Sequence, residues 1–356
     1  MNVAVVGVGL IGGSIGLAAR ERLHARVLGW DPVPGVLEEA RERGAVDVAC
    51  ASLDTALQSA EMAFVAAPVG ALPDVIGAAL AASGPDCVVS DVGSTKRAVL
   101  AAHDDPRFVG GHPLAGAETA GVAAARSDLF DGATWYLTPT ASTSGLLFER
   151  LHRCLAKLGA QPMAIDAETH DRLMAAVSHL PHVLANVLVG QTAQALSDED
   201  ERLPATGPSF RDATRVAGAN SAIWTDIYLS NSEALVAQID DAVARLGQVR
   251  TALEAADGAA VTAWNDAAAE DRRRLLEAQL AGGATHELRV SVPNQPGVVA
   301  RIALELGRAG VNITDMALYP APDMREGVVA LWIAGEEPAA RARELVAGLG
   351  FPVARA

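Results

Sequence analysis

The sequence predicts an α/β protein in three successive parts, and three observations lead to this fold class. From residue 2 to about 166, short runs of Val, Ala and Ile alternate with longer segments of helical period, which is typical of a parallel sheet covered by helices. From about 168 to 280 the strand signal vanishes and apolar residues recur every three or four positions, which predicts helices. Residues 287–353 then give the order strand, helix, strand, strand, helix, strand, which is ferredoxin-like.

We expect a domain boundary at each change of pattern. A chain of 356 residues is too long for one compact core, since ordinary domains hold about 100–200 residues. The segment 281–284, Ala-Gly-Gly-Ala, is typical of a short flexible linker. The expected domains are therefore residues 1–166, an all-helical domain of residues 167–281, and residues 285–356.

Seven apolar runs in the first part are expected to be strands, at residues 3–6, 27–30, 62–66, 87–91, 108–110, 135–138 and 162–165. In the helical part, Asn220 and Asp257 are expected to begin helices, because such side chains accept hydrogen bonds from the free N–H groups of a first turn. Pro181 lies inside a predicted helix, where we expect it to free the carbonyl group of Val177 and to kink the helix.

The composition excludes several classes of protein. A formal net charge of -15 would repel nucleic acid and anionic membranes over most of the surface. No apolar run reaches the ~18 residues needed to span a bilayer, and the first apolar stretch lacks the basic flank of a secretory signal. The three cysteines form no CxxC pair, so neither a disulfide framework nor a metal site is expected. We therefore expect a cytoplasmic protein that acts on small molecules.

A glycine-rich turn follows the first predicted strand and begins a helical segment. The run Gly-Val-Gly-Leu-Ile-Gly at 7–12 matches a dinucleotide-binding fingerprint, and Asp31 closes the next strand roughly 20 residues later, as that fingerprint requires. Gly7 permits the tight turn, Gly9 lets the backbone approach the pyrophosphate, and Gly12 allows close packing of the helix. We therefore expect a Rossmann-type domain whose cofactor contacts include Gly7, Gly9, Leu10, Ile11, Gly12 and Asp31.

The same region favours NAD over NADP. Asp31 would accept hydrogen bonds from the ribose hydroxyls and repel a 2′-phosphate, and residues 32–34 offer no arginine to hold one. Pro68 and Val69 follow another predicted strand, at the edge of the sheet where the cofactor should run. The alternative for these two residues is an ordinary turn between a strand and a helix.

Four polar motifs lie behind this fingerprint. Two loops at the predicted sheet edge, SDVGSTK at 90–96 and GGHPLAGAE at 110–118, would face the nicotinamide. In the helical part, SHLPH at 178–182 places two histidines on one face of a helix. FRDATR at 210–215 places two arginines one helical turn apart, where they could clamp a carboxylate.

Together these motifs resemble those of the prephenate and arogenate dehydrogenases. DVGSTK, GGHPLAGAE, SHLPH and FRDATRVA follow the dinucleotide fingerprint in order, and the resemblance covers residues 1 to about 280. It implies NAD-dependent oxidative decarboxylation of a cyclohexadienyl substrate, in which hydride leaves the ring carbinol carbon for NAD as carbon dioxide departs. For prephenate the product would be 4-hydroxyphenylpyruvate, the precursor of tyrosine. The resemblance also implies a homodimer through the helical domain.

The resemblance assigns roles to individual residues. His112 would accept a hydrogen bond from the ring hydroxyl as general base, for which it must be neutral. Ser94 would hold that hydroxyl and His112 in register beside the cofactor, and Arg215 would bind a substrate carboxylate. The side-chain end of the pocket would be lined by His182, His179 and Trp224.

Each assignment has a structural alternative. His112 could be a hydrogen-bonded turn residue, and Arg215 could pair with Asp212 or cap a helix. Ser94 could cap the helix that follows it, while Lys96 could contact the cofactor or begin a helix in solvent. The two histidines of SHLPH and the tryptophan could belong to an ordinary core.

One position departs from the family pattern. Many members place a hydroxyl residue after the His-Pro-x-Ala-Gly stretch, where this chain has Ala117 followed by Glu118. Because Ala117 cannot donate a hydrogen bond, the choice between prephenate, with its keto group, and arogenate, with its ammonium group, stays open.

The C-terminal part, from about residue 285 to 356, resembles an ACT domain through VPNQPGVV at 292–299 and RAGVNIT at 308–314. In that module the Pro-Gly turn opens the first helix and the Asn-Ile pair begins the second strand. The resemblance implies an amino-acid effector site, with tyrosine as the natural inhibitor; the alternative is a dimerisation scaffold without a ligand. The residues expected to border the site are Asn294, Gly297, Val298, Asn312 and Ile313.

Two other functions compete with a regulated dehydrogenase. A sensor of the same fold could bind NAD and an amino acid without chemistry, but the intact Ser94, His112 and Arg215 argue against it. A dehydrogenase of small hydroxy acids could share the nucleotide domain, but the SHLPH motif and the ACT-like part disfavour it.

Overall fold

The computed structural model describes the chain at 1–116, 119–197, 207–279, 285–293, 298, 302, 305–306, 309, 311, 313–321 and 326–355. By their internal contacts the residues form two compact units, Met1–Ala244 and Arg245–Ala356. The boundary falls inside one long helix, Ser232–Glu254.

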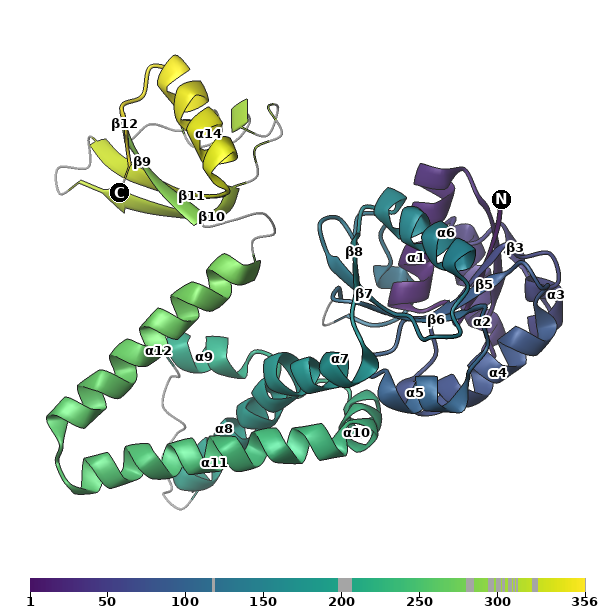
Figure 1. Cartoon of the computed structure of the whole chain (residues 1–356), viewed down its shortest axis with the longest axis horizontal. Coiled ribbons are helices and arrows are strands. Elements are labelled where there is room, and N and C mark those ends of the chain that lie inside the picture. The colour runs from purple at the N-terminus through teal and green to yellow at the C-terminus, as the bar shows by residue number, and fades with distance from the viewer. Residues whose placement is uncertain are drawn as a thin grey trace. The chain divides into compact units, whose positions relative to one another are not determined.

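An eight-stranded sheet forms the N-terminal part of the first unit (Figure 1). Its strands are β1 (Asn2–Val6), β2 (Arg26–Trp30), β3 (Val48–Ala49), β4 (Met62–Val65), β5 (Val88–Asp91), β6 (Phe108–Pro113), β7 (Thr134–Thr138) and β8 (Gln161–Ala164). Their order is β3-β2-β1-β4-β5-β6-β7-β8, and the first six are parallel. This is the 3-2-1-4-5-6 order of a Rossmann-type sheet, so the expected fold class is confirmed.

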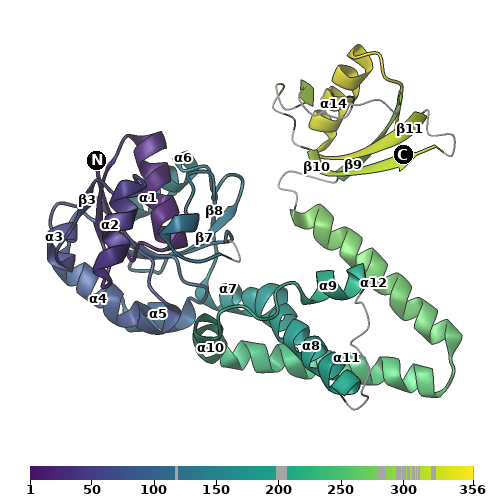
Figure 2. The same cartoon turned by 180° about the vertical axis from the view of Figure 1, so that it is seen from behind.

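Helices cover both faces of the sheet (Figures 1 and 2). They are α1 (Leu10–Leu23), α2 (Pro34–Glu42), α3 (Leu53–Leu57), α4 (Leu72–Ala82), α5 (Arg97–Ala102) and α6 (Gly145–Lys157). Alternate residues of β1 enter two separate cores: Val3 and Val5 pack into one, while Ala4 and Val6 pack into the other. Burial of both faces explains why these strands are continuous apolar runs, the pattern from which they were predicted.

The edge formed by the last two strands differs from the prediction. β7 is antiparallel to β6, and its Tyr136 pairs with His112. His112 therefore lies in a strand that extends to Pro113, and the expectation of a loop from residue 110 onward is wrong at this position. The two-residue β3 was not predicted, since so short a strand leaves no apolar pattern.

The rest of the first unit is helical, as predicted. The helices are α7 (Ala167–Met174), α8 (Leu180–Ser197), α9 (Pro208–Thr214), α10 (Ser221–Ser230) and α11 (Ser232–Glu254). Asn220 accepts hydrogen bonds from two backbone N–H groups of α10, which confirms it as a cap. A π-helical turn, Ala175–His179, joins α7 to α8 and ends two residues before Pro181. This turn accommodates the proline, which supplies no N–H group to the regular helical ladder.

Within the described part of the chain, one helical run, Ala167–Gln194, is long and apolar enough by composition to cross a membrane, with a mean hydropathy of 1.5. Polar residues such as His179, His182 and Asn186 interrupt this run, so it contains no continuous apolar run of ~18 residues. The run carries the fully buried polar side chains of His170 and Asp171, and the core helix of a globular protein passes the same test.

The second unit contains α12 (Gly258–Gln279) and a four-stranded antiparallel sheet. Asp257 accepts a hydrogen bond from the Ala260 N–H group at 3.0 Å, so it caps α12 as predicted. The strands and remaining helix are β9 (Thr285–Pro293), β10 (Ile313–Pro320), β11 (Glu326–Ala334), α14 (Glu336–Gly348) and β12 (Val353–Arg355).

This sheet has the order β10-β11-β9-β12, and α14 lies across one of its faces (Figure 2). The described residues between β9 and β10 include Val298 and Ile302, which are helical. The chain therefore follows the predicted ferredoxin-like βαββαβ order. Val290 of β9 and Ala342 of α14 are fully buried members of the core between the sheet and its helices.

Candidate active site

The glycine-rich turn lies between β1 and α1 and has the geometry of a phosphate-binding loop. Gly7 has a φ of +88°, which a side chain would strain. An added Cβ at Gly12 would overlap the carbonyl oxygen of Gly7, whereas one at Gly9 would meet no described atom within 4 Å. α1 begins at Leu10, and Gly9 offers no capping side chain, so the free N–H groups of the first turn are available to an anion.

Asp31 at the end of β2 fastens this loop. One carboxylate oxygen accepts a hydrogen bond from the Val8 N–H group at 2.9 Å, and the other accepts one from Val33 at 2.9 Å. Each oxygen keeps a further lone pair, so the carboxylate can still accept bonds from ribose hydroxyls. The residues present therefore fit a dinucleotide without a 2′-phosphate.

A second loop of the sheet edge is tied to the helical part. Pro68 and Val69 follow β4, and Val69 begins a short 3₁₀ turn. The next residue, Gly70, donates its N–H group to the carboxylate of Asp226 in α10 at 3.3 Å. Besides acting as a turn, this segment therefore connects the cofactor edge to the helices.

A buried ion pair organises the loop after β5. Lys96 and Asp91 are paired, and both side chains are fully buried. Asp91 also accepts hydrogen bonds from the N–H groups of Gly93 at 2.8 Å and Gly111 at 3.0 Å. Burial lowers the pKa of Lys96, and Asp91 opposes that shift. Lys96 is therefore neither in contact with solvent at a helix start nor placed at the surface for a cofactor. Its partner Asp91 joins β5 to β6.

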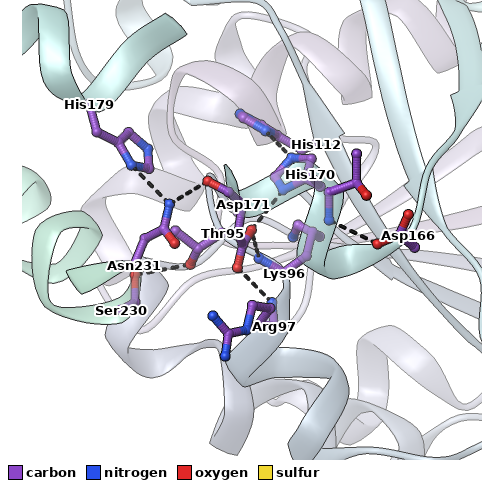
Figure 3. Close-up of polar contacts among 12 residues, drawn as sticks. Thr95, Lys96, Arg97, His112, Asp166, His170, Asp171, His179, Ser230 and Asn231 are labelled. Atoms are coloured by element: carbon purple, nitrogen blue, oxygen red, sulfur yellow. Dashed lines mark hydrogen bonds and ion pairs between the residues drawn. The ribbon is translucent and has the colours of Figure 1, made fainter. Parts of the chain in front are cut away.

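His112 is the first residue of a chain of polar contacts that leads into the helical part (Figure 3). Its Nδ1 lies 2.9 Å from Nε2 of His170, and Nδ1 of His170 lies 2.8 Å from a carboxylate oxygen of Asp171. His112 is partly exposed, whereas His170 and Asp171 are fully buried. The alternative that His112 is only a turn residue is wrong, because it is a strand residue bonded to a distant helix.

Asp171 holds several elements together. Its carboxylate accepts hydrogen bonds from the backbone N–H groups of Lys96 at 2.8 Å and Arg97 at 2.9 Å, and so caps α5 (Figure 3). Its carbonyl oxygen accepts a bond from Asn231 at 2.7 Å. The alternative that Ser94 caps α5 is therefore wrong, since a side chain from α7 does so.

The surroundings keep His112 neutral. Desolvation holds the pKa of His112 well below its usual value, and the nearby His170, Lys96 and His179 lower it further. A neutral imidazole has one nitrogen with a lone pair, so His112 offers a hydrogen-bond acceptor near pH 7.

The SHLPH histidines form an aromatic wall with α10. Trp224 stacks on His182 with ring centroids 3.6 Å apart and meets His179 edge-on at 6.2 Å, so the two histidines share a face as predicted. His182 is hydrogen-bonded to Tyr228, and His179 accepts a bond from Asn231 at 3.2 Å. Burial lowers the pKa of His179 to about 4 and also lowers that of His182. Both rings are therefore neutral.

Three protein-family models match successive stretches of the chain. The prephenate dehydrogenase nucleotide-binding domain matches residues 15–164, the prephenate dehydrogenase dimerization domain matches residues 166–265, and the ACT domain matches residues 286–333. Prephenate dehydrogenase of Bacillus subtilis is 31% identical over an alignment that covers 97% of this chain and 95% of that protein. The chain belongs to the prephenate dehydrogenase family.

Further relatives agree with this family membership. Cyclohexadienyl dehydrogenase of Zymomonas mobilis is 32% identical, with 81% of this chain and 98% of that protein covered. The solved structure of prephenate dehydrogenase from A. aeolicus, in complex with hydroxyphenyl propionate and NAD+, has a TM-score of 0.71 and 27% identity, and covers 76% of this chain and 97% of that one. The resemblance inferred from the motifs, including the ACT domain, is confirmed.

In this prephenate dehydrogenase family member, Arg215 follows the last residue of α9 and its side chain is exposed. The backbone of the next residue, Val216, forms a hydrogen bond that raises the pKa of His182 against the effect of burial. Arg215 therefore precedes Val216, the residue whose backbone contacts His182 of the aromatic wall. Ser94 is partly exposed in the loop between β5 and α5.

Some predicted positions lie outside the described residues: Ala117, Glu118, Asn294, Gly297 and Asn312. Of the other two effector positions, Val298 is helical and Ile313 is the first residue of β10, as the ACT resemblance implied. The sequence interpretation did not select His170, Asp171, Asn231 or Tyr228. Only the adjacency of a histidine and an aspartate eight residues before SHLPH hinted at the first two.

Proposed function

We propose that this chain is an NAD-dependent prephenate dehydrogenase, which converts prephenate to 4-hydroxyphenylpyruvate in tyrosine biosynthesis. The observation that carries the proposal is the environment of His112. It is a neutral, partly exposed histidine at the sheet edge, and its inner nitrogen is bonded to a buried His-Asp pair. A general base for a substrate hydroxyl needs such a side chain.

The cofactor site would use the glycine loop and the neighbouring sheet edge. The first-turn N–H groups of α1 would hold the pyrophosphate, and Asp31 would hold the ribose. Bound NAD would supply the hydride acceptor. The residues proposed to contact it are Gly7, Gly9, Leu10, Ile11, Gly12, Asp31, Pro68, Val69 and Ser94.

His112 would move the proton of the reaction. It accepts the proton of the ring hydroxyl at its free nitrogen as the carbinol carbon loses hydride and becomes a carbonyl. The bond from the ring to the departing carboxylate then breaks, its electron pair makes the ring aromatic, and His112 returns the proton to the phenolate oxygen. Ser94 holds the hydroxyl in register with His112.

The helical part would bind the rest of the substrate. Arg215 is proposed to bind a substrate carboxylate, since a guanidinium group pairs with two carboxylate oxygens. The aromatic wall of His179, His182 and Trp224 is proposed to line the side-chain end of the pocket. A neutral ring can donate a hydrogen bond to the keto oxygen of prephenate. Because the rings carry no positive charge, they would not repel the ammonium group of arogenate.

Oxidation of arogenate is the second candidate. It is favoured by the 32% identity with a protein named cyclohexadienyl dehydrogenase. A non-catalytic sensor of NAD and an amino acid is the third candidate, and the assembled contacts of His112 argue against it.

We also propose how the chain is organised and regulated. Residues 1–166 would bind NAD, 167–281 would bind substrate and form a homodimer, and 285–356 would sense tyrosine. Exposed apolar side chains on α8 and α11 support the dimer, namely Leu184, Val187, Leu188, Val236 and Val243. The effector site would be bordered by Asn294, Gly297, Val298, Asn312 and Ile313. The compartment would be the cytoplasm.

The test is NADH formation by the purified full chain with NAD and either prephenate or arogenate, each with and without tyrosine. Turnover with prephenate supports the proposal, and faster turnover with arogenate favours the second candidate. Tight NAD binding without turnover of either substrate would leave the sensor. Inhibition by tyrosine would support the role given to the C-terminal part.

A further inference from the structure

We propose that Asp171 and His170 are positioning residues that fix the tautomer of His112, so that its Nε2 is the atom that accepts the substrate proton. This inference rests on the proposed function, since it specifies how the base of that reaction is set. The two residues lie on α7, 58 and 59 positions after His112 in the chain, and they reach it from the helical part.

The chain of contacts begins at a carboxylate. Three groups point at Asp171: the backbone N–H groups of Lys96 and Arg97, and Nδ1 of His170 at 2.8 Å. The two backbone groups are obligatory donors, and an ionised carboxylate only accepts, so Nδ1 of His170 must carry a proton.

The proton on Nδ1 of His170 decides the state of the next ring. In neutral His170 the other nitrogen, Nε2, has a lone pair and can only accept. It lies 2.9 Å from Nδ1 of His112, so this bond forms when Nδ1 of His112 carries the proton. Neutral His112 then has its lone pair on Nε2. The tautomers are assigned from the hydrogen-bond network, as is usual for histidine.

The arrangement also holds the His112 ring in one orientation during the reaction. When Nε2 takes the substrate proton, the imidazolium keeps donating from Nδ1 to His170, whose own proton points to the negative Asp171. Both inner residues are fully buried, so water does not replace either bond. Outer partners that orient a functional histidine in this way typically change activity by about 10- to 100-fold when they are removed.

Two substitutions of His170 separate its role as a hydrogen-bond acceptor from its role in packing. In His170→Gln a side-chain oxygen can still accept from His112 Nδ1, whereas His170→Leu leaves no acceptor. We expect His170→Leu to lower kcat by roughly 10- to 100-fold with KM nearly unchanged, and His170→Gln to recover most of the loss. His103→Leu is the matched control, because His103 contacts the backbone of Pro73 and should leave kcat unchanged.

The tautomer is also readable without turnover. In the ¹⁵N NMR spectrum of the histidine-labelled full chain, His112 should show a protonated Nδ1 and an unprotonated Nε2, with its resonances identified by their loss in His112→Gln. In His170→Leu the two tautomers should mix.

The outcomes distinguish this inference from the proposed function. A protonated Nε2 in the wild-type protein would overturn the inference, and so would wild-type kcat in His170→Leu. If neither prephenate nor arogenate is turned over, the proposed function fails while the NMR measurement still decides the tautomer. If His170→Leu does not fold, the wild-type spectrum decides the inference alone.

Discussion

Replacement of Lys96 by methionine tests the energetics of the buried ion pair after β5. Both partners are fully buried, and Asp91 accepts two additional backbone hydrogen bonds. Methionine keeps a long apolar side chain but removes the cation, so that the carboxylate stays buried without a counter-charge. Breaking a buried pair in this way costs about 3–5 kcal/mol of unfolding free energy.

The loss should be visible in thermal unfolding. At roughly 2–4 °C for each kcal/mol in a unit of this size, Lys96→Met should lower Tm by about 6–20 °C. Scanning calorimetry with and without NAD would measure it. The control is Asp91→Asn combined with Lys96→Met, which removes both charges and keeps an acceptor for one N–H group, and should regain most of the stability. An unchanged Tm in the single variant, or a lower Tm in the double variant, would refute the reasoning.

Four further outcomes are expected. Gly12→Ala should abolish NAD binding, measured by titration calorimetry, because the added methyl group would overlap the Gly7 carbonyl oxygen. His112→Asn should lower kcat by about 10²- to 10⁴-fold with little change in KM, since a general base contributes that much. Arg215→Ala should mainly raise KM in steady-state kinetics, because it removes substrate binding. Acid should destabilise the protein through His179, whose pKa falls from 6.5 to about 4 on burial. The unfolded chain then binds more protons between these values, so the unfolding free energy should fall by at most about 3 kcal/mol as the pH drops through that window.

Each of these four predictions can be contradicted by one result. Wild-type NAD affinity in Gly12→Ala would remove the argument from close packing, and wild-type turnover in His112→Asn would remove the base assignment. A lower kcat with unchanged KM in Arg215→Ala would move that residue from binding to catalysis. Denaturant unfolding should show a smaller acid loss in His179→Gln than in the wild type; an equal loss would assign the effect to other groups.

The strands of the sheet could be predicted because the patterns that indicate them lie in residues close together in the sequence. Strands buried on both faces are continuous apolar runs, and the turn at Gly7 and Gly12 requires glycine because other backbone atoms approach closely there. The direction of β7 was not predictable, since an apolar run is the same in a parallel and an antiparallel strand. That direction decides that Tyr136 lies opposite His112 and therefore that His112 is a strand residue.

Only those residues of the site that lie in sequence motifs could be predicted. His112, His179 and His182 lie in recognisable motifs, and the aromatic wall confirms that the latter two share a face. His170 was missed because its partner is 58 positions away, and a helix start with His-Asp is usually an exposed turn. Lys96 was misplaced because lysine is rarely buried, although its partner lies five positions earlier.

The capping of α5 by Asp171 makes the nucleotide-binding part depend on the helical part for its own completion. A fragment that ended before α7 would present two unsatisfied N–H groups at the start of α5 and would leave His112 without its inner neighbour. Asp171 thus links the two parts, and it is synthesised after the nucleotide-binding part. A nascent nucleotide-binding part would therefore lack catalytic activity until the helices that follow it have packed against it.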